Sequence, residues 1–174
     1  AVIDANKPSK NINITGNTFI ARNAQYTGNP YEMGGMVKIL NNETQVAHPF
    51  PYSNHEDINL RNNIFYINGT EGNSRFLYIN NKDEVLPEVK SDNNLFFVNQ
   101  GIYDGNYFQI GDSGIPEPDA EYLTLDQWRS LTGNDISSVY GDPLFGNLNG
   151  EDGSFSVYGF DADLTLQTGS AAIG

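Results

Sequence analysis

One eight-residue pattern occurs three times in this chain and constrains its fold more than any other feature. The pattern spans residues 12–19, 58–65 and 89–96, and it reads apolar, any, apolar or small, any, Gly or Asn, Asn, any, Phe. A second apolar pattern follows each copy, at 37–42, 76–81 and 107–112. Repeats whose two halves keep a fixed order are typical of stacked architectures, in which each unit contacts mainly its neighbours. Equivalent residues of the three copies are therefore predicted to lie over one another.

The sixth position of each copy holds an asparagine at the point where the strand should end. These asparagines are Asn17, Asn63 and Asn94. Asparagine tolerates left-handed backbone geometry at a corner, and its amide can bond to the amide of the next copy. We therefore expect an asparagine ladder. The phenylalanines two positions further on are expected to stack in a column; they are Phe19, Phe65 and Phe96.

One helix is predicted after the repeats, near residues 124–132. Thr124 and Gln127 have the spacing of a capping box, and Gly133 is a stop signal. Leu125, Trp128 and Leu131 share one face of this helix. Because a helix this short depends on packing, we expect it to bury Trp128.

Composition narrows the classes of function. The 174 residues suit one domain, 1–174, and its 23 asparagines and 18 glycines fit a turn-rich β structure. A net charge of −13, with nine scattered basic residues, argues against a nucleic-acid partner. No segment is long and apolar enough to span a membrane. The absence of cysteine favours a bacterial product, secreted or at the cell surface.

The C-terminal third contains further recognisable segments, at 122–135, 141–145 and 163–174. Together with the Asn-Asn-x-Phe repeats, they make residues 11–174 resemble the C-terminal part of right-handed parallel β-helix proteins of the pectate-lyase-like superfamily. Many members are secreted carbohydrate-active proteins of bacteria. The resemblance implies an all-β fold, a right-handed parallel β-helix (solenoid) with one short packed α-helix. It also implies a longer coil, so we expect this chain to be a fragment, or another chain to cover its open end.

The resemblance implies a role in polysaccharide processing. The leading hypothesis is part of a secreted polysaccharide lyase or glycoside hydrolase that binds an extended glycan along the coil. The alternative is a non-catalytic carbohydrate-binding or adhesin-like surface module. A lyase needs a base and a cation, and a hydrolase needs two carboxylates. Whether this chain is an enzyme stays open, because the main catalytic residues can lie outside it.

The candidate catalytic residues are Arg61, Asp92 and His55. Arg61 and Asp92 occupy equivalent outward positions of adjacent copies, so they are expected to be neighbours. A surface salt bridge is the simpler interpretation of this pair, and a catalytic or uronate-binding arginine is the alternative.

The candidate substrate-binding residues come from two kinds of segment. Lys38 and Tyr78, with Gln109, form a predicted column on the second strand, which could line a sugar cleft but is more simply a solvated face. The other candidates are His48 and Tyr52, in the loop at residues 43–57, and Tyr103, as a platform on which a sugar ring could stack.

No metal-ligand set is predicted. His48 and His55 lie in one loop, but their spacing matches no fixed ligand motif. Calcium is possible at the acidic residues between 151 and 163, for which a solvated acidic turn is the simpler interpretation.

Overall fold

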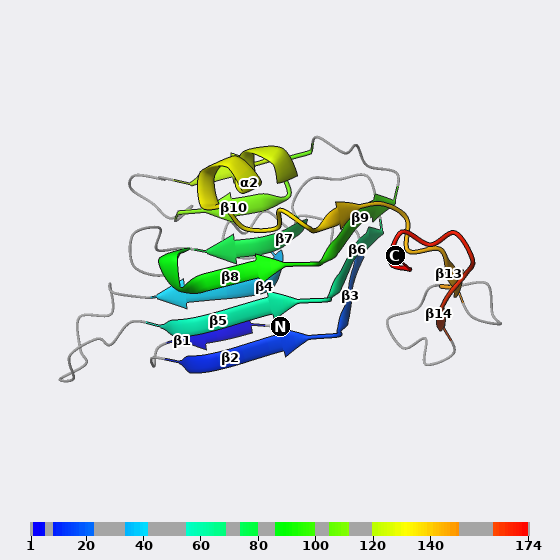
Figure 1. Ribbon diagram of the computed structural model, residues 1–174, viewed down its shortest axis with the longest axis horizontal. Helices are drawn as coiled ribbons and strands as arrows, with labels where there is room; N and C mark the ends of the chain where they lie inside the picture. Colours follow the sequence, from blue (N-terminus) through cyan, green and yellow to red (C-terminus); the bar gives the residue numbers. More distant parts are fainter. Residues whose placement is uncertain are drawn as a thin grey trace.

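The computed structural model describes residues 2–5, 9–22, 34–41, 55–68, 74–79, 86–99, 105–111, 120–149 and 162–173. These residues are mostly in β-strands, arranged in four sheets (Figure 1). The first sheet contains β1 (Val2–Ala5), β4 (Gly34–Asn41), β7 (Ser74–Ile79), β10 (Phe108–Ile110) and β11 (Glu121–Leu123). The second contains β2 (Lys10–Thr15), β5 (Glu56–Arg61) and β8 (Val89–Asp92). The third contains β3 (Thr18–Arg22), β6 (Ile64–Asn68), β9 (Leu95–Asn99) and β12 (Val139–Tyr140). The fourth pairs β13 (Phe145–Asn147) with β14 (Asp163–Leu166), and two helices complete the described part: η2 (Leu86–Glu88) and α2 (Leu125–Thr132).

The three copies of the repeat lie over one another as predicted. Each copy contributes one strand to each of the first three sheets, and equivalent strands pair in parallel. Ile12 lies opposite Ile58, which lies opposite Val89. The repeat therefore fixes the register between neighbouring strands.

The predicted fold class, a single right-handed parallel β-helix, is wrong. The strands form several short sheets of two to five strands that are not arranged as one solenoid. Two pairings are antiparallel, because β11 adds to β10 and β13 pairs with β14. The physical reason is that the repeat specifies only which residues of successive copies face each other. It carries no information on how the connections between strands run or on how the ends of the sheets are completed.

The asparagine ladder is confirmed. Asn63 Oδ1 accepts hydrogen bonds from the backbone N–H and Nδ2 of Asn17, at 3.0 and 3.2 Å. Asn94 Oδ1 accepts the same two bonds from Asn63, at 3.0 and 3.2 Å. In return, Asn63 Nδ2 donates to the carbonyl of Ile14 and Asn94 Nδ2 to that of Leu60. Asn63 and Asn94 thus each join the preceding copy through both ends of the amide, whereas Asn17 contributes only its donors.

The ladder residues do not themselves take the left-handed conformation that we expected of them. The residue before each one takes it: Gly16 (φ 67°), Asn62 (φ 56°) and Asn93 (φ 55°). Because this preceding residue turns the chain, the ladder residue can direct both its backbone N–H and its amide toward the next copy.

The core contains side chains from the first three sheets and from α2. The predicted phenylalanine column is confirmed, since the rings of Phe19 and Phe65 stack at 5.0 Å between centroids and those of Phe65 and Phe96 at 5.2 Å. Trp128 is fully buried and stacks on Phe108 at 5.2 Å. The helix therefore adds its indole ring to the core aromatic cluster.

The helix prediction is confirmed in detail. The Thr124 side chain accepts from the Gln127 backbone N–H at 3.2 Å, and the Gln127 side chain accepts from the Thr124 N–H at 2.9 Å. Gly133 ends the helix with φ 71°. These two caps satisfy helix-end groups that would otherwise need water.

Replacing Asn63 with alanine should lower the free energy of unfolding by about 2–3 kcal/mol, because buried donors and acceptors of two neighbouring copies lose their partners. Asn59→Ala is the matched control on the same strand pair, since its half-buried amide bonds only to Asp57. Urea unfolding of both variants measures the difference. Equal losses for the two would contradict a stabilising role for the ladder.

Candidate functional site

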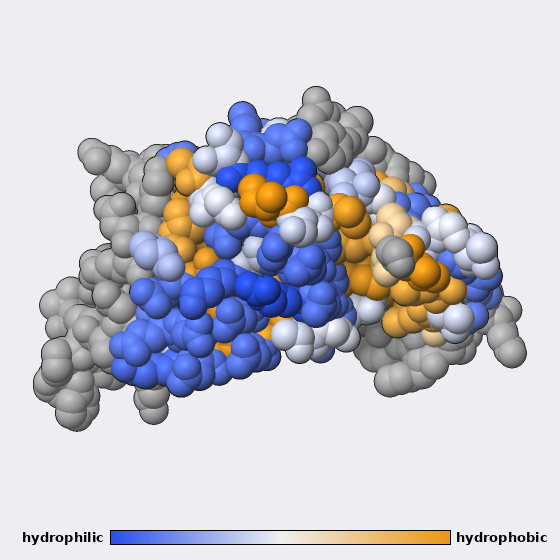
Figure 2. Space-filling view, viewed as in Figure 1, coloured by the Kyte–Doolittle hydropathy of each residue, from blue (hydrophilic) through white to orange (hydrophobic). Residues whose placement is uncertain are grey.

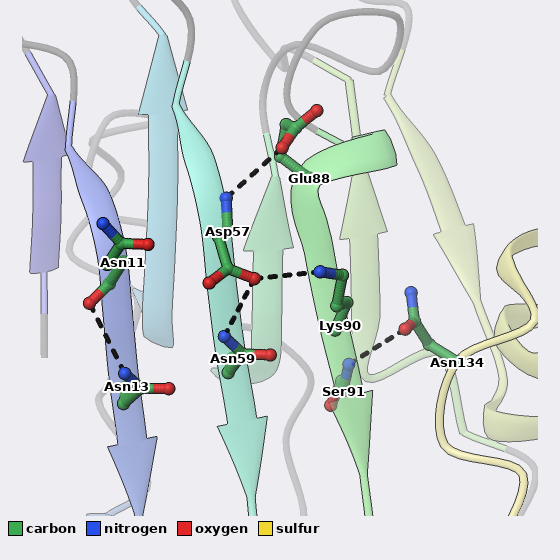
Figure 3. A network of polar contacts seen from close by, with 8 residues as sticks. All are labelled: Asn11, Asn13, Asp57, Asn59, Glu88, Lys90, Ser91 and Asn134. Carbon is green, nitrogen blue, oxygen red and sulfur yellow. Dashed lines mark hydrogen bonds and ion pairs between the residues drawn. The ribbon is translucent and has the colours of Figure 1, made fainter.

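The outer surface of the β2–β5–β8 sheet is polar and exposed (Figure 2). Figure 3 shows its central network, in which Asp57 accepts from Lys90 at 2.9 Å and from Asn59 at 3.2 Å. Glu88 accepts from the Asp57 backbone N–H at 3.3 Å. The hydrogen bond from Lys90 holds the pKa of the Asp57 carboxyl below its usual value. Asp57 is therefore a charged, paired surface group and is unsuited to donate a proton as a general acid.

Arg61 and Asp92 lie side by side in register on this surface, as predicted. The predicted salt bridge is wrong, because the ion pairs of the described residues do not include this pair. Asp92 Oδ1 instead accepts the backbone N–H of Ser137 at 2.7 Å. The carboxylate thus fixes the segment that follows α2, and Arg61 is exposed to solvent.

His55 is separated from these two residues. It is buried immediately before β5, and its Nδ1 accepts the backbone N–H of Ser9 at 3.3 Å. Arg61 ends the same strand six residues later, about 20 Å away at the usual rise of a strand. The structure therefore does not bring the three predicted catalytic residues together.

Several predicted residues fall outside the described part of the chain. These are His48, Tyr52 and Tyr103, together with most of the acidic residues between 151 and 163. Asp163 is described and exposed, and a hydrogen bond from Thr165 lowers the pKa of its carboxyl. Across the described ranges, no group of three or more His, Cys, Asp or Glu side chains is placed to hold a metal ion. None of the helices in those ranges has the length and apolar character needed to cross a bilayer.

A second face lies on the β4–β7–β10–β11 sheet. The predicted column is present, since Lys38 is in register with Tyr78, and Tyr78 with Gln109. Strand β11 adds Tyr122 opposite Gln109, so that the amide lies between two tyrosine positions. The interpretation of this column as a solvated face is wrong, because only 9% of Tyr78 and 1% of Gln109 are exposed.

Two cations accompany the aromatic rings on this second face. Lys38 Nζ lies 5.8 Å from the centre of the Tyr78 ring, and the guanidinium carbon of Arg75 lies 5.0 Å from that of Tyr122. Burial lowers the pKa of Lys38. Burial also lowers the pKa of Arg75, and this effect is larger than the opposing effect of the nearby tyrosines. We call this set the Gln109 face: Lys38, Arg75, Tyr78, Gln109 and Tyr122.

The Gln109 amide is the most unusual group of the face. Its side chain is buried, yet neither Oε1 nor Nε2 has a hydrogen-bond partner in the described part of the chain. A buried polar group without a partner costs about 1–3 kcal/mol. Such groups are rare in folded proteins, and those that occur call for an explanation. The face thus presents one unused donor group and one unused acceptor side by side.

The sequence pattern does not indicate that Arg75 and Tyr122 belong to this face. Tyr122 is on an antiparallel strand that lies outside the repeat, so no repeat position points to it. Arg75 is at the start of β7, where the side chains do not follow a simple alternation: both Phe76 and Leu77 belong to the core. Only the packing of β11 beside β10 places these two residues together.

In comparisons with known proteins, no protein-family model, no curated protein and no solved structure matches this chain. The resemblance to pectate-lyase-like proteins stays a prediction.

Proposed function

We propose that this chain is a carbohydrate-binding module that holds a polysaccharide at the Gln109 face. The observation that carries this proposal is the buried Gln109 amide, which has no partner for its oxygen or nitrogen among the described residues. A sugar hydroxyl can both donate and accept a hydrogen bond. Because the amide is only 1% exposed, a pair of sugar hydroxyls would satisfy both of its ends after the side chains around it move aside on binding.

The surroundings of the amide support a sugar ligand. Ligand sites usually combine aromatic walls with a few placed polar groups, and Tyr78 and Tyr122 flank Gln109 in register. The row from Lys38 to Tyr122 crosses four neighbouring strands. At about 4.8 Å per strand it extends about 14 Å, which suits an extended chain better than a single small molecule.

Binding fits this face better than bond cleavage does. None of the five residues of the Gln109 face is a carboxylate or a histidine, whereas glycosidic cleavage by a hydrolase needs two carboxylates. The predicted catalytic residues Arg61 and Asp92 are on a different sheet from the Gln109 face. A module with a polysaccharide ligand would act outside the cell, as a secreted or surface protein.

The direct test is affinity electrophoresis of the protein through gels that contain soluble neutral or uronate-rich polysaccharides. At least one polysaccharide should retard the protein, and Gln109→Met should weaken that interaction about tenfold or more, since two hydrogen bonds are lost. Gln167→Met is the matched control, because Gln167 is exposed near β14. Failure of every polysaccharide to bind would overturn the proposal.

Stability provides an independent test of the same variant. Methionine has nearly the size of glutamine but no amide, so Gln109→Met should leave the free energy of unfolding unchanged or raise it by about 1–3 kcal/mol. Thermal unfolding without ligand measures this. A lower stability would mean that the amide is bonded in the folded protein and serves the fold, which would contradict a role in ligand binding.

A further inference from the structure

Among the described residues, no strand lies beside the outer edges of β2 and β3, which we call the open edge. Strand β2 is at the end of its sheet and pairs only with β5, and β3 is at the end of its sheet and pairs only with β6. Ile14 and Phe19 are half-buried, whereas their equivalents in the second copy, Leu60 and Phe65, are fully buried. In the described part of the chain, two strands of the first copy therefore have an uncovered outer side, whereas its third strand, β4, pairs with β1 on that side.

The opposite end of the ladder is closed. Ser138 Oγ accepts the backbone N–H of Asn94 at 2.8 Å, which is the bond that an asparagine of a further copy would otherwise accept. Asp135 accepts from Asn94 Nδ2 at 3.0 Å and from the indole of Trp128 at 2.8 Å. In Figure 1, α2 and β10 lie at this closed end and β2 lies at the other.

The ladder also has a direction. At each step, the asparagine of the earlier copy donates its backbone N–H and its Nδ2 to the Oδ1 of the later asparagine. The later asparagine in turn donates its Nδ2 to a strand carbonyl of the earlier copy. In the described part of the chain, no asparagine of an earlier copy lies beside Asn17. Its Nδ2 donates to the Thr15 carbonyl of its own strand, at 3.0 Å, and no donor among the described residues reaches its Oδ1. Asn17 therefore offers an exposed acceptor to whatever covers this edge.

We propose that the open edge of β2 and β3 binds a strand–corner–strand segment of a separate partner polypeptide that carries the same eight-residue pattern, aligned in parallel. The corner asparagine of that segment donates to Asn17 Oδ1, and its phenylalanine stacks on Phe19. Its backbone pairs with the unpaired groups of the two edge strands, as in other cases of strand addition. An acidic residue at the position of Glu56 would lie opposite Lys10, since these positions are in register within the chain.

A second copy of the same chain does not fit this edge. Two copies that met through their open ends would bring two Asn17 acceptors together without a donor between them. The other end of a second copy is closed by Asp135, Ser138 and α2. The direction of the ladder therefore favours a partner that contributes the earlier step of the same ladder.

A synthetic peptide with the sequence of residues 55–68 tests the proposal. Labelled with a fluorophore, it should bind the full chain in an anisotropy titration, and amide exchange should slow in β2 and β3. Asn17→Ala should weaken binding about tenfold, as the loss of one or two hydrogen bonds predicts. Asn13→Ala is the matched control, because Asn13 is exposed on the same edge strand and bonds only weakly, to the Asn11 carbonyl at 3.5 Å.

Three further results decide the outcome. A peptide in which the equivalent of Phe65 is alanine should bind more weakly, and a scrambled peptide should not bind. Gln109→Met should bind the peptide normally, so that this interaction is separated from polysaccharide binding. No binding, equal binding of the scrambled peptide, or an edge-to-edge dimer seen by sedimentation and unaffected by the peptide would each overturn the proposal. Circular dichroism of Asn17→Ala confirms that the variant is folded.

Discussion

Replacing Asp135 with alanine is expected to lower the free energy of unfolding by about 4 kcal/mol, a large part of the roughly 5–15 kcal/mol by which an ordinary domain is stable. The side chain is fully buried and accepts three hydrogen bonds: from Asn94 Nδ2 at 3.0 Å, from Ser138 Oγ at 2.6 Å and from Trp128 Nε1 at 2.8 Å. Alanine would leave the Trp128 indole N–H and the Ser138 hydroxyl buried without their acceptor, whereas Asn94 Nδ2 would keep the Leu60 carbonyl. Its own backbone would also be strained, because Asp135 has φ 55° and alanine disfavours that region by about 1–2 kcal/mol.

Chemical unfolding with tryptophan fluorescence measures this effect, since Trp128 is the only tryptophan and is one of the three donors. Asp135→Asn keeps one acceptor oxygen and tolerates the positive φ. We therefore expect it to lower the free energy of unfolding by about half as much as Asp135→Ala does. Asp142→Ala is the surface control, because Asp142 is exposed and its side chain accepts only the Leu144 N–H. A loss for Asp135→Ala no larger than that for Asp142→Ala would mean that the closed end of the ladder is not held by this carboxylate.

Replacing Phe96 with alanine is expected to lower the free energy of unfolding by about 3–5 kcal/mol, through lost burial and the cavity left behind. Phe96 is fully buried, and its ring centre lies 5.2 Å from that of Phe65, 4.9 Å from Phe76 and 5.2 Å from Phe108. These neighbours come from three different strands, so they cannot all move to fill the space.

Phe97→Ala is the matched control one residue further along the strand. Its ring is half-buried and lies 5.6 Å from Tyr66 and 6.0 Å from Tyr140, on the other side of β9. We expect Phe97→Ala to lower the free energy of unfolding by much less than Phe96→Ala does, and urea unfolding of both variants measures the difference. Equal losses would contradict the phenylalanine column as the centre of the core.

The two proposed binding regions are on different parts of the molecule. The Gln109 face is on β4, β7, β10 and β11, whereas the open edge belongs to β2 and β3. Substitutions at Gln109 and Asn17 are therefore expected to act independently, each on its own ligand. A loss of both interactions from either substitution would point to a general disturbance of the fold.

Part of this structure could be predicted from the repeat because stacking depends on short-range rules. A residue type that recurs at one position of each copy must meet its equivalents if the strands pair in register. The ladder of Asn17, Asn63 and Asn94 and the stacking of their phenylalanines follow from this rule. The helix at Leu125–Thr132 followed from local capping chemistry, which does not depend on the rest of the fold.

The candidate site could be predicted only in part. The sequence placed Lys38, Tyr78 and Gln109 in one column, but a period-two pattern cannot show whether the outward side of a strand is covered. It also assigned Arg61, Asp92 and His55 to one reaction, although residues at the two ends of one strand cannot meet. The functions of His48, Tyr52 and Tyr103 stay predictions.

The repeat alone indicated which residues of successive copies touch, because the same residue type recurs at the same position of each copy and the strands pair in register. The three-dimensional packing was needed to show that the strands form several short sheets instead of one solenoid, and that Asp135 and Ser138 close the ladder. It alone also showed that the Gln109 amide is buried without a partner among the described residues. These features depend on segments outside the repeat, whose positions are set by packing between residues far apart in the chain.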